Sequence, residues 1–313
     1  MDAIKIDSLT TDLKYVVNAF FESSTLSCYT CNTCTVECPV NKTVGRLDPR
    51  KIVRMAAFGM KEELLGSVEL WLCMQCRKCT NVCPQKVEPT SAIYYFRNLA
   101  VKEGFVSGEF VKVTDEIDEY SQKLRQYIYA SALKAKKNGE RLNVHELISG
   151  AIKGLNSESE TSESTENGFK IDKLMFGEFP EAKFVQCLTC RECTVSCIVS
   201  RSIKAFDPVK IMRTCYVGKE DDLLASPELW LCISCETCTE VCKQGVKGSV
   251  LISRLKKKAI EKGVLPPETE SEFAEIDRSI HEIRAELITR AWDKRKEIQS
   301  FELTSEIKKV IGS

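Results

Sequence analysis

Residues 28–38 read CYTCNTCTVEC, and the same cysteine spacing, C-x2-C-x2-C-x3-C, returns at residues 73–83, 187–197 and 232–242. These four motifs contain all but one of the chain's 17 cysteines. Three thiolates at positions i, i+3 and i+6 of one loop suit three iron corners of a [4Fe-4S] cube, while the fourth cysteine is directed to a different cube. The spacing therefore predicts four [4Fe-4S] clusters and a role in electron transfer.

Other uses of cysteine fit this spacing less well. Zinc sites usually join two C-x2-C pairs across a dozen or more residues, and a disulfide framework belongs to small secreted domains. Rieske centres need paired histidines, whereas His145 and His281 lie far from every motif and are expected to be ordinary helix residues. A structural zinc protein stays a rival, which a colourless preparation without acid-labile sulfide would support.

The ligand assignment follows from the rule that the fourth cysteine of each motif serves the neighbouring cluster. It predicts four crossed sets: Cys28, Cys31, Cys34 and Cys83; Cys73, Cys76, Cys79 and Cys38; Cys187, Cys190, Cys193 and Cys242; Cys232, Cys235, Cys238 and Cys197.

Length and composition indicate two globular domains of average size. The chain has 313 residues, of which 43% are hydrophobic and 29% charged. No apolar run is long enough to span a membrane, and the absence of a signal segment favours the cytoplasm. The formal charge is zero, but four oxidised clusters with their thiolates bring it to about −8. This disfavours nucleic acid as a partner.

The chain contains one unit twice. Shifting the sequence by 159 residues superimposes Cys28 on Cys187 and the ELWLC of residues 69–73 on that of residues 228–232. Residues 154–168 are rich in serine and glutamate and predict a flexible linker. We therefore expect a first domain at 1–153 and a second at 169–313, which dock on each other as a pseudo-two-fold pair or are bridged by a partner.

The residues between the motifs predict helices. Asp48 and Asp207 can each cap a helix that begins at the following proline. Further helices are expected over 91–103 and 249–262, each ended by a glycine. Strand alternation is nearly absent, so the predicted fold is all-α, with two tandem alpha-helical ferredoxin-like domains and long helical extensions.

Each repeat ends in a charged helical tail with a narrow apolar stripe. Such a stripe needs a surface to cover it, either its own cluster domain, the other stripe, or another protein. The stripes are Phe110, Val113, Ile117, Tyr120, Leu124 and Tyr127 in the first tail, and Phe273, Ile276, Ile280, Ile283 and Leu287 in the second.

Several features together resemble HdrC, an iron–sulfur subunit of heterodisulfide reductase. They are the spacing between paired motifs, the ELWLC before the second motif, Cys83-Pro84 followed by Val87, and the tail that ends near Gly104. The resemblance covers residues 27–106 and 186–265 separately. It implies an all-helical ferredoxin module with two [4Fe-4S] clusters, partnered by a flavin-bearing HdrA-like protein and a catalytic HdrB-like protein.

The resemblance implies a relay protein without its own catalytic site. No Cys-Cys dipeptide of the kind that HdrB-like proteins carry, and no G-x-G-x-x-G nucleotide fingerprint, occurs in the chain. The alternatives are a freely diffusing polyferredoxin or the iron–sulfur subunit of another dehydrogenase complex, such as a glycerol-3-phosphate or glycolate dehydrogenase. Co-purifying proteins would distinguish these functions.

The two halves differ next to the motifs. The prolines after the last cysteines of the first half are replaced by Ile198 and Lys243, which favours a higher reduction potential in the second half. The basic pair at 77–78 is replaced by Glu236 and Thr237, which acts in the opposite sense. No direction of electron flow follows. Cys215, outside the motifs, is expected to be a small buried side chain.

Overall fold

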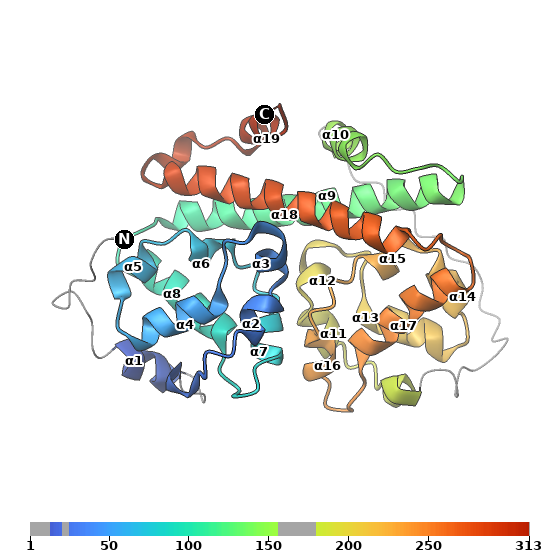
Figure 1. Ribbon diagram of the computed structural model, residues 1–313, viewed down its shortest axis with the longest axis horizontal. Helices are drawn as coiled ribbons and strands as arrows, with labels where there is room; N and C mark the ends of the chain where they lie inside the picture. The colour runs from blue at the N-terminus through green and yellow to red at the C-terminus, as the bar shows by residue number, and fades with distance from the viewer. Residues whose placement is uncertain (1–12, 21–24, 156–179, 313) are drawn as a thin grey trace. The chain divides into compact units, whose positions relative to one another are not determined.

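The computed structural model describes residues 13–20, 25–155 and 180–312 (Figure 1). All regular elements within these ranges are helices, so the all-α prediction is confirmed. None of the helices in the described ranges is both long and apolar enough to cross a membrane. The predicted linker lies outside the described residues from residue 156 onward, and the domain division at 154–168 stays a prediction.

The chain forms two compact units, and each combines segments from both halves of the sequence. The first unit contains residues 1–118 and 281–313, and the second contains residues 119–280. The long tail helices α9 (Gly108–Lys137) and α18 (Thr269–Asp293) therefore each contribute to both units. Each cysteine-bearing repeat is packed against part of the tail of the other repeat.

The first unit holds the first two cysteine motifs. Helix α4 packs against α8 and connects the two motif loops. Apart from parts of α9 and α18, its elements are α1 (Leu13–Phe20), η2 (Thr25–Ser27), α2 (Thr33–Val36), α3 (Pro39–Val44), α4 (Pro49–Ala57), α5 (Lys61–Leu65), α6 (Glu69–Leu72), α7 (Lys78–Asn81), α8 (Pro89–Lys102), η5 (Arg295–Ser300) and α19 (Leu303–Gly312).

The second unit holds the other two motifs, and α13 and α14 pack against α17. Apart from parts of α9 and α18, its elements are α10 (Val144–Leu155), η3 (Pro180–Ala182), η4 (Phe184–Gln186), α11 (Glu192–Val195), α12 (Ile198–Ser202), α13 (Pro208–Tyr216), α14 (Glu220–Leu224), α15 (Pro227–Trp230), α16 (Thr237–Glu240) and α17 (Gly248–Glu261).

The predicted helix starts are confirmed. The Asp48 carboxylate accepts a hydrogen bond from the backbone N–H of Lys51, and Asp207 accepts one from Val209, so each satisfies an otherwise unpaired donor of the first turn. Helices α8 and α17 end before Gly104, as predicted, and before its counterpart at residue 263, both with positive φ.

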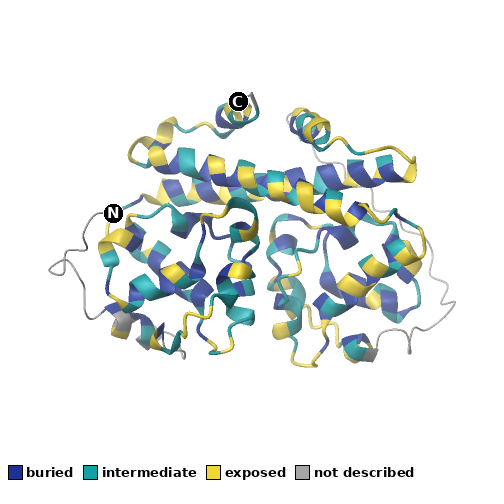
Figure 2. Cartoon of the chain, in the orientation of Figure 1, coloured by how far each residue is buried: buried dark blue, intermediate teal, exposed yellow. Residues whose placement is uncertain are grey.

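The apolar stripes of both tails are largely covered (Figure 2). In α9, Phe110, Ile117 and Leu124 are fully buried, while the other three predicted stripe residues are half-buried. In α18 every predicted stripe residue except Ile283 is buried, and Ile283 is half-buried. The tails are therefore part of the hydrophobic core of the units.

An aromatic group joins the tails to the ELWLC segment in the first unit. The Phe110 ring lies edge-on to Trp71 at 4.8 Å between ring centroids and edge-on to Trp292 at 5.8 Å. Phe110 belongs to the first tail and Trp292 to the second. This group therefore packs both tails on the segment that leads into Cys73.

The second unit has an analogous aromatic group built from different positions. The Phe273 ring lies edge-on to Trp230 at 5.2 Å and stacks on Tyr129 at 4.6 Å. Phe273 comes from the second tail and Tyr129 from the first. Again one residue of each tail packs on the segment that leads into a motif.

Candidate metal centre

Four cavities in the structure are lined by cysteines in the predicted combinations. Each cavity is lined by three cysteines of one motif and the fourth cysteine of the paired motif. The cysteines are Cys28, Cys31, Cys34 and Cys83 in one cavity; Cys73, Cys76, Cys79 and Cys38 in the next; Cys187, Cys190, Cys193 and Cys242, with Cys238 beside them, in the third; Cys232, Cys235, Cys238 and Cys197 in the last.

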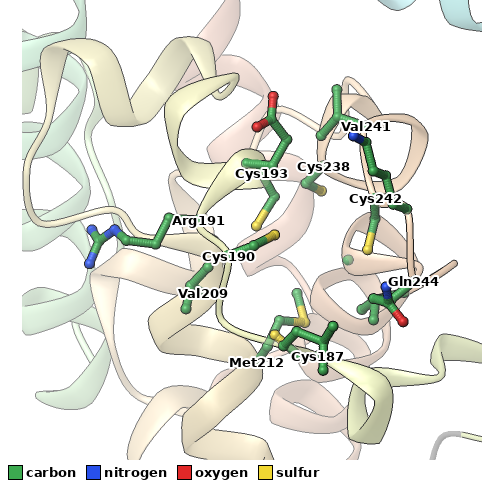
Figure 3. A pocket seen from close by; sticks show the side chains of 15 residues that line it. Cys187, Cys190, Arg191, Cys193, Val209, Met212, Cys238, Val241, Cys242 and Gln244 are labelled. Atoms are coloured by element: carbon green, nitrogen blue, oxygen red, sulfur yellow. The ribbon is translucent and has the colours of Figure 1, made fainter.

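Figure 3 shows the third of these cavities. The sulfur atoms of Cys187, Cys190, Cys193 and Cys242 point toward a common space bordered by Met212. Across the described ranges, no three His, Cys, Asp or Glu side chains lie close enough together to hold a single metal ion.

Gly248 also lines this cavity, where there is little room for a side chain. A Cβ atom there would lie 3.0 Å from the Cys238 sulfur and 3.0 Å from the Met212 methyl carbon. Such contacts are tighter than close-packed side chains normally make. The absence of a side chain at this position therefore preserves the space beside the sulfur atoms.

All four motif loops share an unusual backbone. In each loop the second and fourth residues after the first cysteine have positive φ, and none of them is glycine. A left-handed conformation costs non-glycine residues on the order of 1 kcal/mol each and recurs where a loop wraps around a ligand. The residues are Thr30 and Asn32, Gln75 and Arg77, Thr189 and Arg191, and Ser234 and Glu236.

This backbone directs N–H groups toward sulfur in two of the loops. The backbone N–H of Gln75 donates to the Cys73 sulfur at 3.3 Å, and that of Ser234 donates to the Cys232 sulfur at 3.4 Å. Hydrogen bonds to the sulfur stabilise a thiolate and tune the potential of an iron–sulfur cluster. The loop conformation therefore fits cysteines that serve as anionic ligands.

The thiols of one cavity disfavour one another's ionisation. Burial raises the pKa of Cys193 to about 11, and Cys187 and Cys242 add to the rise by charge repulsion. Burial likewise raises the pKa of Cys38 to about 11, with a further contribution from Cys73. Without iron these groups hold protons at neutral pH, and a bound metal would displace those protons.

The cavities fall into two classes by exposure. In the outer sites, defined as those of Cys28 and Cys187, one cysteine is exposed to solvent, namely Cys31 or Cys190. In the inner sites, defined as those of Cys73 and Cys232, no cysteine is exposed, and all four cysteines of the Cys73 site are buried. The contrast is largest in the first unit, because three cysteines of the Cys232 site in the second unit are half-buried and only Cys197 is buried.

Two half-buried cations beside the inner sites were missing from the sequence-based prediction. The Arg97 guanidinium donates to the carbonyl oxygens of Leu70 and Trp71 at 2.9 and 3.1 Å, and also to that of Cys73. Lys256 donates to the Cys232 carbonyl at 3.0 Å. Arg97 and Lys256 are separated by the repeat length, so the repeat alignment pairs them, but only the structure shows that both lie beside an inner site.

Both tryptophans of the ELWLC segments are buried, and their indole N–H groups have no hydrogen-bond partner within the described ranges. Trp71 is 2% exposed and Trp230 is 3% exposed. Buried donors without partners are rare in native proteins. Neither Trp71 nor Trp230 lines one of the four cysteine cavities.

Cys215 is separate from these sites. It lies on α13, is fully buried, and lines none of the four cavities. Burial raises its pKa to about 12. The prediction of a small buried side chain is confirmed.

Comparisons with known proteins agree with this geometry. A family model described as a 4Fe-4S dicluster domain matches residues 24–87, and a second model with the same description matches residues 169–246. Two dicluster domains account for four clusters, so the prediction of four [4Fe-4S] clusters is confirmed. Which cysteine binds which cluster stays a prediction.

Curated relatives match about a third of the chain. The HdrC iron–sulfur protein of the CoB–CoM heterodisulfide reductase of Methanopyrus kandleri is 33% identical over 125 residues, which is 34% of this chain and 65% of the relative. The HdrC protein of the ferredoxin:CoB-CoM heterodisulfide reductase of Methanosarcina mazei is 37% identical over 94 residues, 30% of this chain and 57% of the relative. The chain thus spans about three fifths of these relatives' length.

Proposed function

We propose, on the premise that this chain belongs to the HdrC family of heterodisulfide reductase as a tandem duplication of the dicluster module, that it relays electrons within a heterodisulfide-reductase-like complex. Its partners would be an HdrA-like flavoprotein and a disulfide-reducing HdrB-like protein. The duplicated dicluster domain carries this proposal. The bound clusters would supply one-electron redox chemistry, and the protein would position and insulate them.

The crossed ligand sets are part of this proposal. Each of the four cavities brings together cysteines from two motifs that are 45 residues apart, as Cys28 and Cys73 are. Crossed ligation ties two loops of one unit through the same pair of clusters. Loss of one ligand should therefore weaken the fold around it as well as the cluster.

Substitution of Cys83 and Cys38 tests the crossing. With crossed sets, Cys83→Ser removes a ligand from the exposed outer site, and Cys38→Ser removes one from the buried inner site. Bleaching of the visible absorption by an iron chelator should have a fast outer and a slow inner phase. Cys83→Ser should alter the fast phase and Cys38→Ser the slow phase, whereas the reverse assignment would refute crossing. Unchanged iron content and circular dichroism in Cys83→Ser would also contradict the ligand role.

The surface around the outer sites supports a relay to partner proteins. Large apolar side chains are exposed next to each outer motif at positions that correspond in the two repeats. Singly exposed apolar side chains are common, but their recurrence at equivalent positions beside both outer motifs favours a contact surface for a partner. They are Leu26, Tyr29 and Val36 in the first repeat and Val185, Leu188 and Val195 in the second, with exposures from 39% to 72%.

Anaerobic purification of the tagged full-length chain tests the complex. We expect it to retain one protein with bound flavin and one with a non-cubane iron–sulfur site, together with about sixteen irons on this chain. Tyr29→Gln and Leu188→Gln should weaken retention without loss of iron. A chain that purifies alone with its full iron content would instead favour a diffusing polyferredoxin. We place this complex in the cytoplasm, where thiol ligands stay reduced.

A further inference from the structure

Two guanidinium groups are buried at equivalent places in the two units. Arg125 in α9 is 4% exposed and Arg284 in α18 is 3% exposed. They are separated by the repeat length, and so are their ion-pair partners Asp118 and Asp277. Each arginine belongs to the tail of one repeat but lies against the ELWLC segment of the other repeat.

In the second unit, Arg125 binds the segment that leads into Cys232. Its Nη1 donates to the carbonyl oxygen of Leu231 at 2.5 Å, and its Nη2 to that of Trp230 at 3.4 Å. Its Nε pairs with a carboxylate oxygen of Asp277 at 2.5 Å. Lys256, from the second repeat, donates to the carbonyl of Cys232 itself. Two cations from different repeats therefore converge on one inner site.

In the first unit the roles of the repeats are exchanged. The Nη1 of Arg284 donates to the carbonyl oxygen of Leu72 at 2.7 Å, directly before Cys73, and its Nε pairs with Asp118 at 2.6 Å. Its Nη2 is buried without a hydrogen-bond partner among the described residues. Arg97, from the first repeat, donates to the carbonyl of Cys73. The inner site again has one cation from each repeat.

The positive charges of Arg125 and Arg284 are held in the buried interior, where electrostatic interactions are strongest. Burial lowers the pKa of Arg125, but Asp277 and Tyr129 outweigh this effect and raise that pKa above its usual value. Arginine stays protonated in proteins in any case. The two carboxylates bind the Nε edges of the guanidinium groups, whereas the Nη1 atoms face the ligand segment. In a low-dielectric interior such charges are only weakly screened.

Reduction adds one negative charge to a cluster, so a nearby fixed cation favours the reduced form and raises the reduction potential. Burial of the inner sites acts in the opposite direction, because it disfavours added charge. We propose that the fixed positive charges of Arg125 and Arg284 raise the reduction potential of the inner cluster. In each case this cluster belongs to the repeat that does not supply the arginine. Each inner cluster can then accept an electron from its outer neighbour although it lies away from solvent.

This inference rests on the cluster assignment proposed above, and the test separates the two. Iron and acid-labile sulfide are measured first on the anaerobic full-length protein. About sixteen irons and four one-electron steps in an EPR-monitored potential titration support the four clusters on which the proposed function rests, whatever the variants then do. Far fewer irons would refute that assignment and the inference together.

Variants that remove either the positive or the negative charge of the Arg125–Asp277 pair then test the effect of Arg125 on the reduction potential. Arg125→Gln should move one of the four steps to a more negative potential, and Asp277→Asn should move the same step to a more positive one. Arg125→Lys should leave this step near its wild-type potential, because lysine keeps the positive charge. A disturbance of packing alone would not reverse its sign between Arg125→Gln and Asp277→Asn. Lys123→Gln, on the exposed face of the same helix, is the matched control and should move no step.

A second set of variants tests whether each arginine acts on the inner cluster of the other repeat. Lys256→Gln should move the same step as Arg125→Gln, while Arg284→Gln and Arg97→Gln should both move a different step. If Arg125→Gln loses iron, the shift in Asp277→Asn still decides the question. Unmoved steps, shifts of the same sign in the Arg125 and Asp277 variants, or separate steps for Arg125 and Lys256 would overturn the inference.

Discussion

Replacing Phe273 by leucine removes the centre of the aromatic group in the second unit. The ring is 3% exposed and contacts two aromatic partners, Trp230 and Tyr129. Each aromatic pair contributes about 0.5–1.5 kcal/mol beyond buried area. The change of shape adds roughly 1 kcal/mol. Phe273→Leu should therefore lower the free energy of unfolding by about 2–4 kcal/mol, without introducing a polar group.

The assay is urea unfolding of the anaerobic holoprotein, followed by far-ultraviolet circular dichroism and by loss of the visible iron–sulfur absorption. The midpoint should fall by roughly 1 M. Trp230 lies two residues before Cys232, so both signals should shift together. The equivalent variant in the first unit is Phe110→Leu, which loses contacts with Trp71 and Trp292.

Phe58→Leu is the matched control, because this phenylalanine is 56% exposed. Its effect should stay within about 0.5 kcal/mol. If Phe273→Leu shifts the midpoint no more than Phe58→Leu does, the aromatic group does not hold the tails on the unit. If the dichroism shifts while the visible absorption does not, the group stabilises the helices without supporting the cluster site.

Three other substitutions have defined outcomes. Lys136→Ala should cost about 2–3 kcal/mol in the same unfolding assay, because it leaves Glu272 without the buried ammonium 2.6 Å away, whereas Lys123→Ala should cost about 0.5 kcal/mol or less. Hydrogen bonds from Lys294 and Lys309 lower the pKa of Glu306 to about 2. The ionised carboxylate therefore stabilises the fold above its unfolded pKa, and this stabilisation disappears as pH falls through 2. Glu306→Gln should lose stability at neutral pH and show a shallower acid transition, and an unchanged acid transition would contradict this. Cys215→Ala should keep the full iron content, and its thiol in the wild type should resist alkylation at neutral pH; loss of iron would assign it a role at a cluster.

Much of the candidate site was accessible from local sequence. The cysteine spacing acts within eleven residues, and the caps at Asp48 and Asp207 act within one turn, so neither depends on distant contacts. The left-handed residues of the loops were not predicted, because none is glycine and side chains such as those of Gln75 and Arg77 give no local signal for positive φ.

The buried arginines show the same limit on a larger scale. From sequence, an arginine on a charged helix is expected to be exposed to solvent. The only local sign against this is that arginine occurs at the same position of both repeats, as Arg125 and Arg284. Their burial depends on carbonyl groups of another segment, more than a hundred residues away along the chain.

The amino-acid sequence by itself determined the helical fold class, the duplication, and the four groups of cysteines, because each is written in short-range spacing or in a fixed repeat. Only the tertiary structure decided which surface each tail covers. An apolar stripe has no directional preference, so the stripe beginning at Phe110 could pack equally well on its own repeat or on another. Long-range hydrogen bonds and ring contacts select an arrangement in which each tail packs partly on its own repeat and partly on the other.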